Sequence, residues 1–258
     1  MFHGLFLIAW RELRAYLLSP IAYGITAVFL ALSGFFFFQH LADYSIKSLQ
    51  FQFPGTQELL AALHPNQQIL QPLFDQMSIF LLFLTPILTM RLIAEERRTG
   101  SFDLLRSYPL TERAIVVGKY LAALGILVLM LALTWVYPLL LTWLGCPDLL
   151  AAAVGYLGLG LVGAAFTAIG CFASALTDKQ VLAAAVAFFG SSCLWLAEWP
   201  ARNTTGWLKT VLTHLSMRAH LLDFFNGILV TSHVLFYAFL ALFWLFLAVQ
   251  VTEGLRWR

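Results

Sequence analysis

MRLIAEERRTGSFDLLRSYPLTERAIVVGK, residues Met90–Lys119, is a charged stretch between two long apolar runs. It holds six of the chain's 15 lysines and arginines and four of its 13 aspartates and glutamates. Charged side chains are costly inside a bilayer, so this crowding places the stretch in water beside the membrane. We interpret it as a loop that the protein presents to a partner.

The composition of the whole chain is that of a membrane protein. Of its 258 residues, 61% are hydrophobic and only 11% are charged, and the mean hydropathy is +0.84. A soluble domain usually carries about 25% charged residues. We therefore predict an all-α integral membrane protein. The net charge of +2 is too small to indicate a nucleic-acid partner.

Six apolar runs are long enough to cross the membrane, since roughly 20 helical residues span about 30 Å of hydrocarbon. The predicted spans, within one polytopic domain of residues 1–258, are 20–40, 76–94, 113–145, 150–177, 180–198 and 231–252. The second run is short, and we extend it to Ala94 by letting the long side chain of Arg91 reach the interface. Pro86 is expected to kink that helix.

The distribution of basic residues predicts the orientation. With the N-terminus in the cytoplasm, the inner segments carry eleven lysines and arginines and the outer segments carry four. Basic residues are retained on the cytoplasmic side. Both termini and the Met90–Lys119 loop are therefore predicted to be cytoplasmic.

Two segments outside the spans have helical patterns. Residues 1–18 place apolar side chains on one face and Arg11, Glu12 and Arg14 on the other, which is typical of an interfacial helix. The chain is then expected to turn at Ser19–Pro20. Within an outer segment, residues 200–230, the stretch Gly206–Asp223 is predicted to form one helix, either re-entrant or lying flat on the surface.

No motif for catalysis, metal binding or nucleotide binding is present in the sequence. Gly118–Lys119 lacks the upstream glycine and the following Ser or Thr of a phosphate-binding loop. No acidic pair lies deep within a span, where it would indicate a proton or ion relay. We expect no catalytic, cofactor-binding or metal-binding residues in this chain.

Small residues line the fourth span, which allows close helix packing. The glycines are Gly155, Gly158, Gly160, Gly163 and Gly170. They serve either packing within the bundle or a dimer face.

The charged loop has a predicted local structure of its own. Arg91–Arg98 continues the second span out of the membrane, and Thr99–Gly100 ends that helix because glycine suits the position after a helix. A short helix follows over Phe102–Ser107, and Thr111 begins the third span. The short helix exposes an apolar cluster, Phe102, Leu104 and Leu105. This cluster is either a docking surface or a contact with lipid headgroups.

The string M-R-L-I-A-E-E-R-R-T-G-S-F-D-L-L-R-S-Y-P-L-T, followed by Gly118–Lys119, resembles the signature of ATP-binding-cassette (ABC) type-2 permeases. Residues Trp10–Pro20 are similar to the entry helix of that family, and Phe224–Leu229 and Glu253–Arg258 extend the likeness to the end of the chain. The combination looks most like the gliding-motility-associated permease branch.

The resemblance implies that residues 95–112 form the loop whose coupling helix docks on an ATPase. The implied contacts are Glu95, Glu96, Arg97, Arg98, Thr99, Gly100, Ser101, Phe102, Asp103, Leu104 and Leu105. It also implies a separate ATPase dimer that holds ATP and Mg²⁺, a second permease copy or related permease, and an auxiliary membrane protein with an extracytoplasmic domain. The implied location is the bacterial inner membrane.

Three functions remain open from the sequence. The first is the non-catalytic permease subunit of an ATP-driven exporter of unidentified substrate. The second is a mechanotransmission subunit that passes ATPase motion to an outside partner without moving a substrate. The third, a membrane-embedded enzyme or ion channel, is disfavoured because no acidic pair lies deep within a span.

Glu95 and Glu96 carry two hypotheses. Either the pair only keeps a helix end solvated, or at least one carboxylate forms a charge-assisted hydrogen bond. Its donor would be a basic residue of this bundle or of the ATPase.

Overall fold

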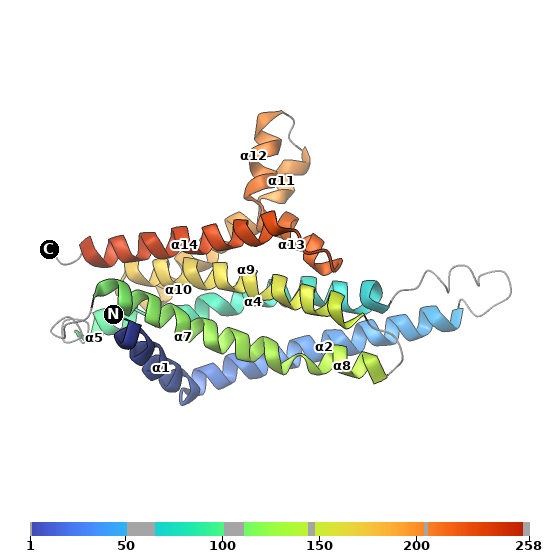
Figure 1. The fold of residues 1–258 in the computed structure, drawn as a ribbon, viewed down its shortest axis with the longest axis horizontal. Coiled ribbons are helices and arrows are strands. Elements are labelled where there is room, and N and C mark those ends of the chain that lie inside the picture. Colours follow the sequence, from blue (N-terminus) through green and yellow to red (C-terminus); the bar gives the residue numbers. More distant parts are fainter. Residues whose placement is uncertain (1, 51–64, 101–110, 144–147, 204–205, 255–258) are drawn as a thin grey trace.

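The computed structural model describes residues 2–50, 65–100, 111–143, 148–203 and 206–254. These residues form helices and no strands, and six of the helical segments are long and apolar enough to cross a membrane. The predicted class, an all-α integral membrane protein, is confirmed. Figure 1 shows the bundle with its helices running along the long axis.

The six spans follow one another in chain order. They are α2 (Pro20–Gln50), η1 with α4 (Asn66–Leu70 and Gln71–Thr89), α7 continued by α8 (Glu112–Leu133 and Val136–Trp143), α9 (Leu149–Leu176), α10 (Gln180–Leu196) and α14 (Thr231–Gly254). The shorter helices are α1 (Phe2–Leu17), α5 (Ala94–Thr99), α11 (Glu198–Asn203), α12 (Trp207–Leu215) and α13 (Met217–Phe225). α1, α5 and the last turn of α14 lie at one end of the bundle, called the α5 end below (Figure 1).

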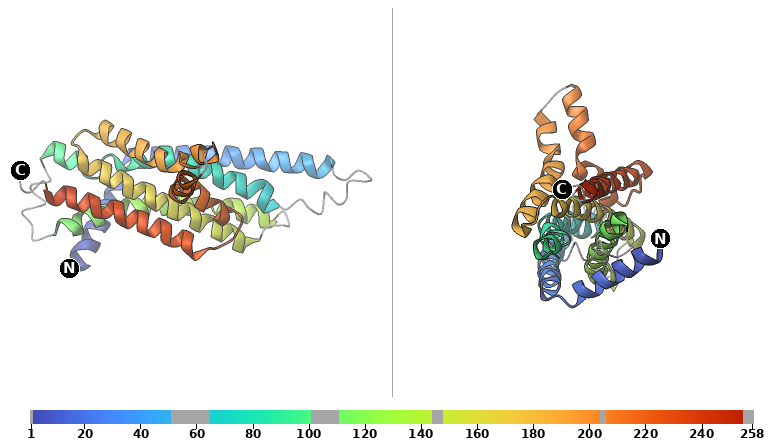
Figure 2. Two further views of the ribbon diagram at one scale, coloured as in Figure 1. Left: turned by 90° about the horizontal axis from the view of Figure 1, so that it is seen from above. Right: turned by 90° about the vertical axis from the view of Figure 1, so that its left-hand side faces the viewer.

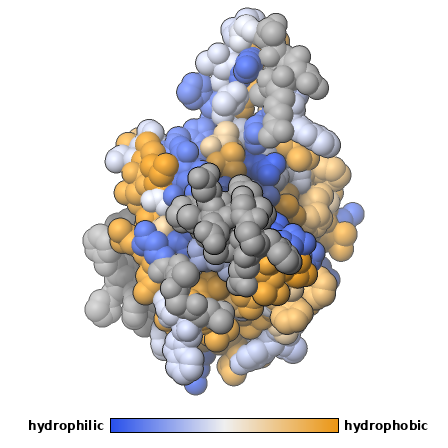
Figure 3. Space-filling model, turned by 90° about the vertical axis from the view of Figure 1, so that its right-hand side faces the viewer, coloured by the Kyte–Doolittle hydropathy of each residue, from blue (hydrophilic) through white to orange (hydrophobic). Residues whose placement is uncertain are grey.

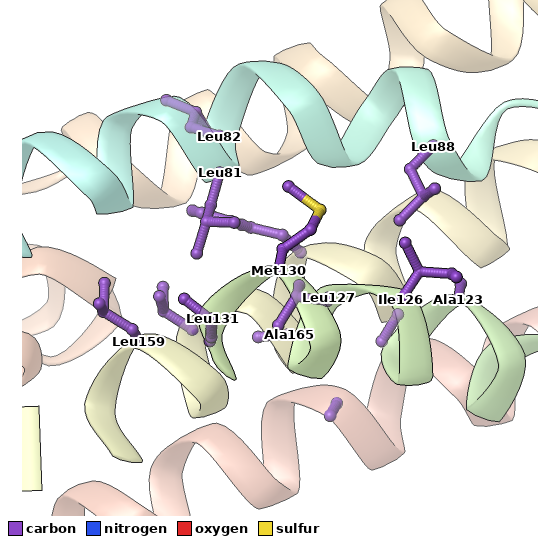
Figure 4. Packing of buried hydrophobic residues seen from close by; sticks show 14 of the residues in the cluster. Leu81, Leu82, Leu88, Ala123, Ile126, Leu127, Met130, Leu131, Leu159 and Ala165 are labelled. Carbon is purple, nitrogen blue, oxygen red and sulfur yellow. The ribbon is translucent and has the colours of Figure 1, made fainter. Parts of the chain in front are cut away.

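α9 is the central helix of the bundle. It contacts α4, α7, α10, α13 and α14. Figure 4 shows part of the core, where Leu81 of α4 and Met130 of α7 point into the space between the helices and Leu88 of α4 lies near Ile126 of α7. Lipid is as apolar as these side chains, so close packing holds the helices together more than exclusion of water does.

Four of the five glycines on α9 allow that close packing. A Cβ added at Gly155, Gly158, Gly163 or Gly170 would come within 3.0 Å of a side chain of α4, α7 or α13. Gly160 instead faces open space, with nothing within 4 Å. The hypothesis of packing within the bundle is therefore confirmed for these four positions.

Gly170→Ala should destabilise the protein by about 1–3 kcal/mol, because the new methyl group would overlap Thr89 and force the helices apart. Gly160→Ala is the matched control on the same helix, and it should be neutral or slightly stabilising because alanine favours helix. Unfolding of both variants in mixed micelles measures the difference. Equal stability of the two variants would contradict this account of the α9 face.

Several helix ends differ from the sequence predictions. α4 ends at Thr89, and a turn over residues 90–93 separates it from α5, so the prediction of one continuous helix through Arg98 is wrong. The third span is interrupted at Thr134–Trp135. The turn before Pro20 is confirmed, and α2 continues to Gln50, well beyond the predicted end at residue 40.

The prediction of one helix over Gly206–Asp223 is also wrong. Ser216 has an extended backbone, ends α12 and begins α13, where its hydroxyl accepts a hydrogen bond from the Ala219 amide at 3.3 Å. α13 packs against α4, α9, α10 and α14, whereas α12 has no buried residue. Figures 1 and 2 show α11 and α12 projecting sideways from the bundle.

The N-terminal helix α1 lies along α7. Ile8 and Leu13 occupy the space that side chains at Gly118 and Gly125 would fill. The Tyr16 hydroxyl donates a hydrogen bond to the Leu88 carbonyl of α4 at 3.2 Å. Part of the apolar face of α1 therefore contacts protein, in addition to any contact with lipid.

Candidate functional site: the junction at α5

The start of α5 is held by a side chain of α9. The amides of Ile93 and Ala94 both donate to the Ser174 hydroxyl oxygen at 3.0 Å, and that hydroxyl donates to the Met90 carbonyl at 3.3 Å. The first amides of a helix have no partner within the helix. Ser174 is fully buried, so it satisfies both amides where water cannot. It thereby stabilises the break between α4 and α5.

The end of α5 follows the sequence prediction. Gly100 has φ +72° and its amide donates to the Arg97 carbonyl at 3.4 Å. Glycine adopts this left-handed conformation without steric cost. The predicted helix break at Thr99–Gly100 is confirmed. Ser101, Phe102, Asp103, Leu104 and Leu105 lie outside the described residues, so their coupling role stays a prediction.

Arg97 binds within the bundle. Its Nη1 donates to the Ala175 carbonyl at 2.7 Å, near the end of α9. Carbonyls in the last turn of a helix lack partners within the helix and attract cations. Arg98, Thr99 and Gly100 are exposed at the end of α5. Of the predicted coupling residues, Arg97 is thus directed towards α9, and these three are accessible to a partner.

A buried ion cluster joins α5 to two other helices. The Lys119 ammonium on α7 lies 2.7 Å from Glu96 Oε1 and 3.3 Å from Glu12 Oε1 on α1. The Lys119 side chain is only 2% exposed. Arg11 donates to Glu12 Oε1 at 2.7 Å and brings a second cation to the cluster. A charge this buried requires such partners, because an isolated ion would lose its hydration without compensation.

The two hypotheses for the glutamates are now separated. Glu96 forms the charge-assisted hydrogen bond to a basic residue of this bundle, which confirms that alternative. Glu95 is 43% exposed and its distance to Arg91 Nε is 4.0 Å. A pair this long and exposed contributes little to stability.

Three residues of the junction were missed by the sequence analysis: Glu12, Lys119 and Ser174. Lys119 carried a usable signal, since it is a lysine followed by a long apolar run, and Glu12 lies on the polar face of α1. Ser174 carried none, because a serine within an alanine-rich run has no distinctive pattern. Among the described residues, no group of three metal-binding side chains is present at the junction or elsewhere.

α5 is connected to three other helices of the bundle. α5 directly precedes residues 101–110. Its own contacts reach α7 through Glu96 and α9 through Arg97 and Ser174, and Lys119 of α7 extends the ion cluster to Glu12 of α1. One of these helices, α9, contacts most of the bundle.

A six-span helical bundle has the architecture of a multi-pass membrane protein. Residues 6–191 match the family model of the ABC-2 family transporter protein, which is well over half of the chain. The chain therefore belongs to the ABC-2 permease family. This family supplies the transmembrane subunit of ABC transporters, and that subunit pairs with an ABC ATPase. No curated protein matches the chain.

Proposed function

We propose that this chain is the permease subunit of an ATP-driven exporter, in which α5 transmits closure of the ATPase dimer to the spans. The observation that carries the proposal is the ion cluster of Glu96, Lys119 and Glu12, which joins the helix before the coupling loop to α1 and α7. The chain itself is non-catalytic in this proposal, and ATP and Mg²⁺ bind to the ATPase. Of the predicted coupling residues 95–105, residues 98–105 supply the contacts of this chain with the ATPase, whereas Glu96 and Arg97 are bonded within the bundle.

The proposed assembly contains two permeases, because ABC ATPases close as dimers around two nucleotides. The second permease is another copy or a related chain, and the translocation route lies between them. The likeness to the gliding-motility-associated branch further suggests an auxiliary membrane protein with an extracytoplasmic domain. The assembly is proposed to lie in the bacterial inner membrane.

Glu96→Gln tests the coupling role, with Glu95→Gln as its matched neighbour. Glutamine keeps the shape of residue 96 and removes its charge, so the ATPase should still co-purify while hydrolysis no longer responds to the permease. Glu95→Gln should behave as wild type, since the ion pair of Glu95 with Arg91 is long and exposed and contributes little. ATPase activity of the complex in lipid is the measurement. If Glu96→Gln hydrolyses ATP with the same dependence on the permease as wild type, the ion cluster does not have the proposed coupling role.

The proposed orientation places the α5 end in the cytoplasm. α1 and α5 lie at this end, and Arg113 at the start of α7 pairs with Glu253 at the end of α14, 3.3 Å apart. Both ends of the chain thus lie on the side that the basic residues predict to be cytoplasmic.

Cysteine labelling tests this orientation once the native cysteines are replaced. Labels at residues 57 and 203 should react in intact cells, and labels at residues 107 and 179 only after permeabilisation. The opposite pattern would reverse the orientation.

A mechanotransmission role is the second candidate function. α2 has 31 residues, a length of about 46 Å, whereas the hydrocarbon core is about 30 Å thick. The helix therefore extends beyond the core at the end opposite α5, where it offers a surface for an outside partner. ATPase activity that responds to such a partner and to no substrate would favour this role over export.

A further inference from the structure

Two neighbouring cavities lie towards the end of the bundle opposite α5. The first has a volume of about 260 Å³ and a largely apolar lining, formed by Ile79, Trp195, Leu196, Glu198, Trp199 and Arg218. These residues come from α4, α10, α11 and α13. Tryptophan is enriched where a span meets the headgroup region, so this cavity has the character of a membrane interface.

The second cavity, called the polar cavity below, is larger and has a more polar lining than the first, with a volume of about 450 Å³. Its polar lining includes His40, Asp43, Lys47, Gln68, Asp75 and Arg218. Lys47 donates to Gln68 at 3.0 Å across this region. Figure 3 looks onto this end of the molecule, where hydrophilic residues gather between apolar flanks. The larger volume is within the range of small-ligand pockets, about 300–1,000 Å³, and the smaller one, just below that range, has room for part of an acyl chain.

Arg218 belongs to the walls of both cavities. Along α4, Asp75 lines the polar cavity and Ile79 lines the apolar cavity, so the two are one helical turn apart. Of the two cavities, the apolar one lies closer to the centre of the bundle, because Ile79 is further along α4 than Asp75. The apolar cavity and the more polar one are thus neighbours, and both have the Arg218 cation in their walls.

The Arg218 guanidinium is oriented by hydrogen bonds to Asp75 and has further N–H donors for a ligand. Its Nε and Nη2 donate to the two Asp75 oxygens at 3.2 and 3.1 Å. A guanidinium has five N–H groups, so three remain after this pairing. The side chain is 37% exposed. Arginine held in this way suits a planar or tetrahedral anion such as a phosphate.

We propose that the two cavities form a binding site for one phospholipid. An acyl chain enters the apolar cavity, the phosphate contacts Arg218, and the rest of the headgroup lies in the polar cavity. Asp43 in the polar cavity is an anion, so it suits a cationic amine in the headgroup. The site therefore fits a zwitterionic headgroup such as phosphoethanolamine. This inference does not depend on the proposed function.

Native mass spectrometry of the full-length chain with added phosphatidylethanolamine tests the site. Arg218→Gln should reduce the lipid-bound fraction at least about tenfold, because a charge-assisted hydrogen bond of this kind is worth that much in affinity. Asp75→Asn breaks the same ion pair but keeps the cation, and should bind lipid as well as wild type. Lys209→Gln, on α12 outside both cavities, is the control for general loss of positive charge.

Three results would overturn the proposal. The first is unchanged binding in Arg218→Gln. The second is an equal loss in Asp75→Asn, which would show that the ion pair only holds the helices together. The third is displacement of the lipid by inorganic phosphate or by chain-free glycerophosphoethanolamine at equal concentration, which would make this a site for soluble ligands.

Discussion

Lys119→Met should lower the free energy of unfolding by about 3–5 kcal/mol, the usual cost of removing one partner from a buried ion pair. Methionine fills the space, but Glu12 and Glu96 would be left beside each other without the cation that both of them contact. Unfolding of the full-length chain in mixed micelles measures the loss. Coupled ATPase activity should fall with it, because α5 would lose its link to α7.

Two further variants separate this effect from a general loss of charge. Arg113→Met removes the cation of an exposed pair, with side chains 69% and 37% exposed, and should cost about 0–1 kcal/mol. Adding Glu12→Gln and Glu96→Gln to Lys119→Met should recover most of the stability, since no uncompensated charge remains buried. A triple variant as unstable as Lys119→Met would show that the cluster's charges are not the cause.

Phe102→Ala combined with Leu105→Ala should abolish co-purification of the ATPase. Desolvated apolar anchors at an interface typically cost about 2 kcal/mol or more when truncated, which is roughly thirtyfold in affinity for each residue. The experiment is affinity capture of the chain in mild detergent, followed by quantification of the bound ATPase and its activity.

The matched control is Leu149→Ala with Leu150→Ala at the start of α9. These leucines are 43% and 75% exposed, so their truncation tests the loss of exposed apolar surface away from the coupling loop. The control should retain the ATPase. If the variant with Phe102→Ala and Leu105→Ala captures as much ATPase as the wild-type chain does, the coupling contact lies elsewhere.

The helices that the sequence predicted correctly depend on local signals. Six apolar runs gave six spans, because span length depends only on bilayer thickness and helical rise. Thr111 begins α7 with a side-chain cap, and Gly100 ends α5 in a left-handed conformation. Each of these features depends on one or two residues and their immediate neighbours, so the sequence alone is sufficient.

The sequence analysis missed two helix breaks. One depends on a distant residue, and the other depends on the backbone and hydroxyl of a single serine. The second span breaks at residues 90–93, and its freed amides are satisfied by Ser174, about eighty positions away. Ser216 divides the segment after α11 because its hydroxyl begins a new helix that then packs into the bundle. Periodicity continues through both breaks and therefore did not reveal them.

The sequence by itself determined the class of protein, the spans and the charged loop, since all three follow from hydropathy and local backbone preference. Only the tertiary structure decided which charges of that loop are used within the chain. It places Glu96 beside Lys119 and Glu12, Arg97 against α9, and leaves Arg98 exposed. The physical reason is that a buried charge must find its partner in space, and close packing of α1, α7 and α9 brings together residues that no local pattern connects.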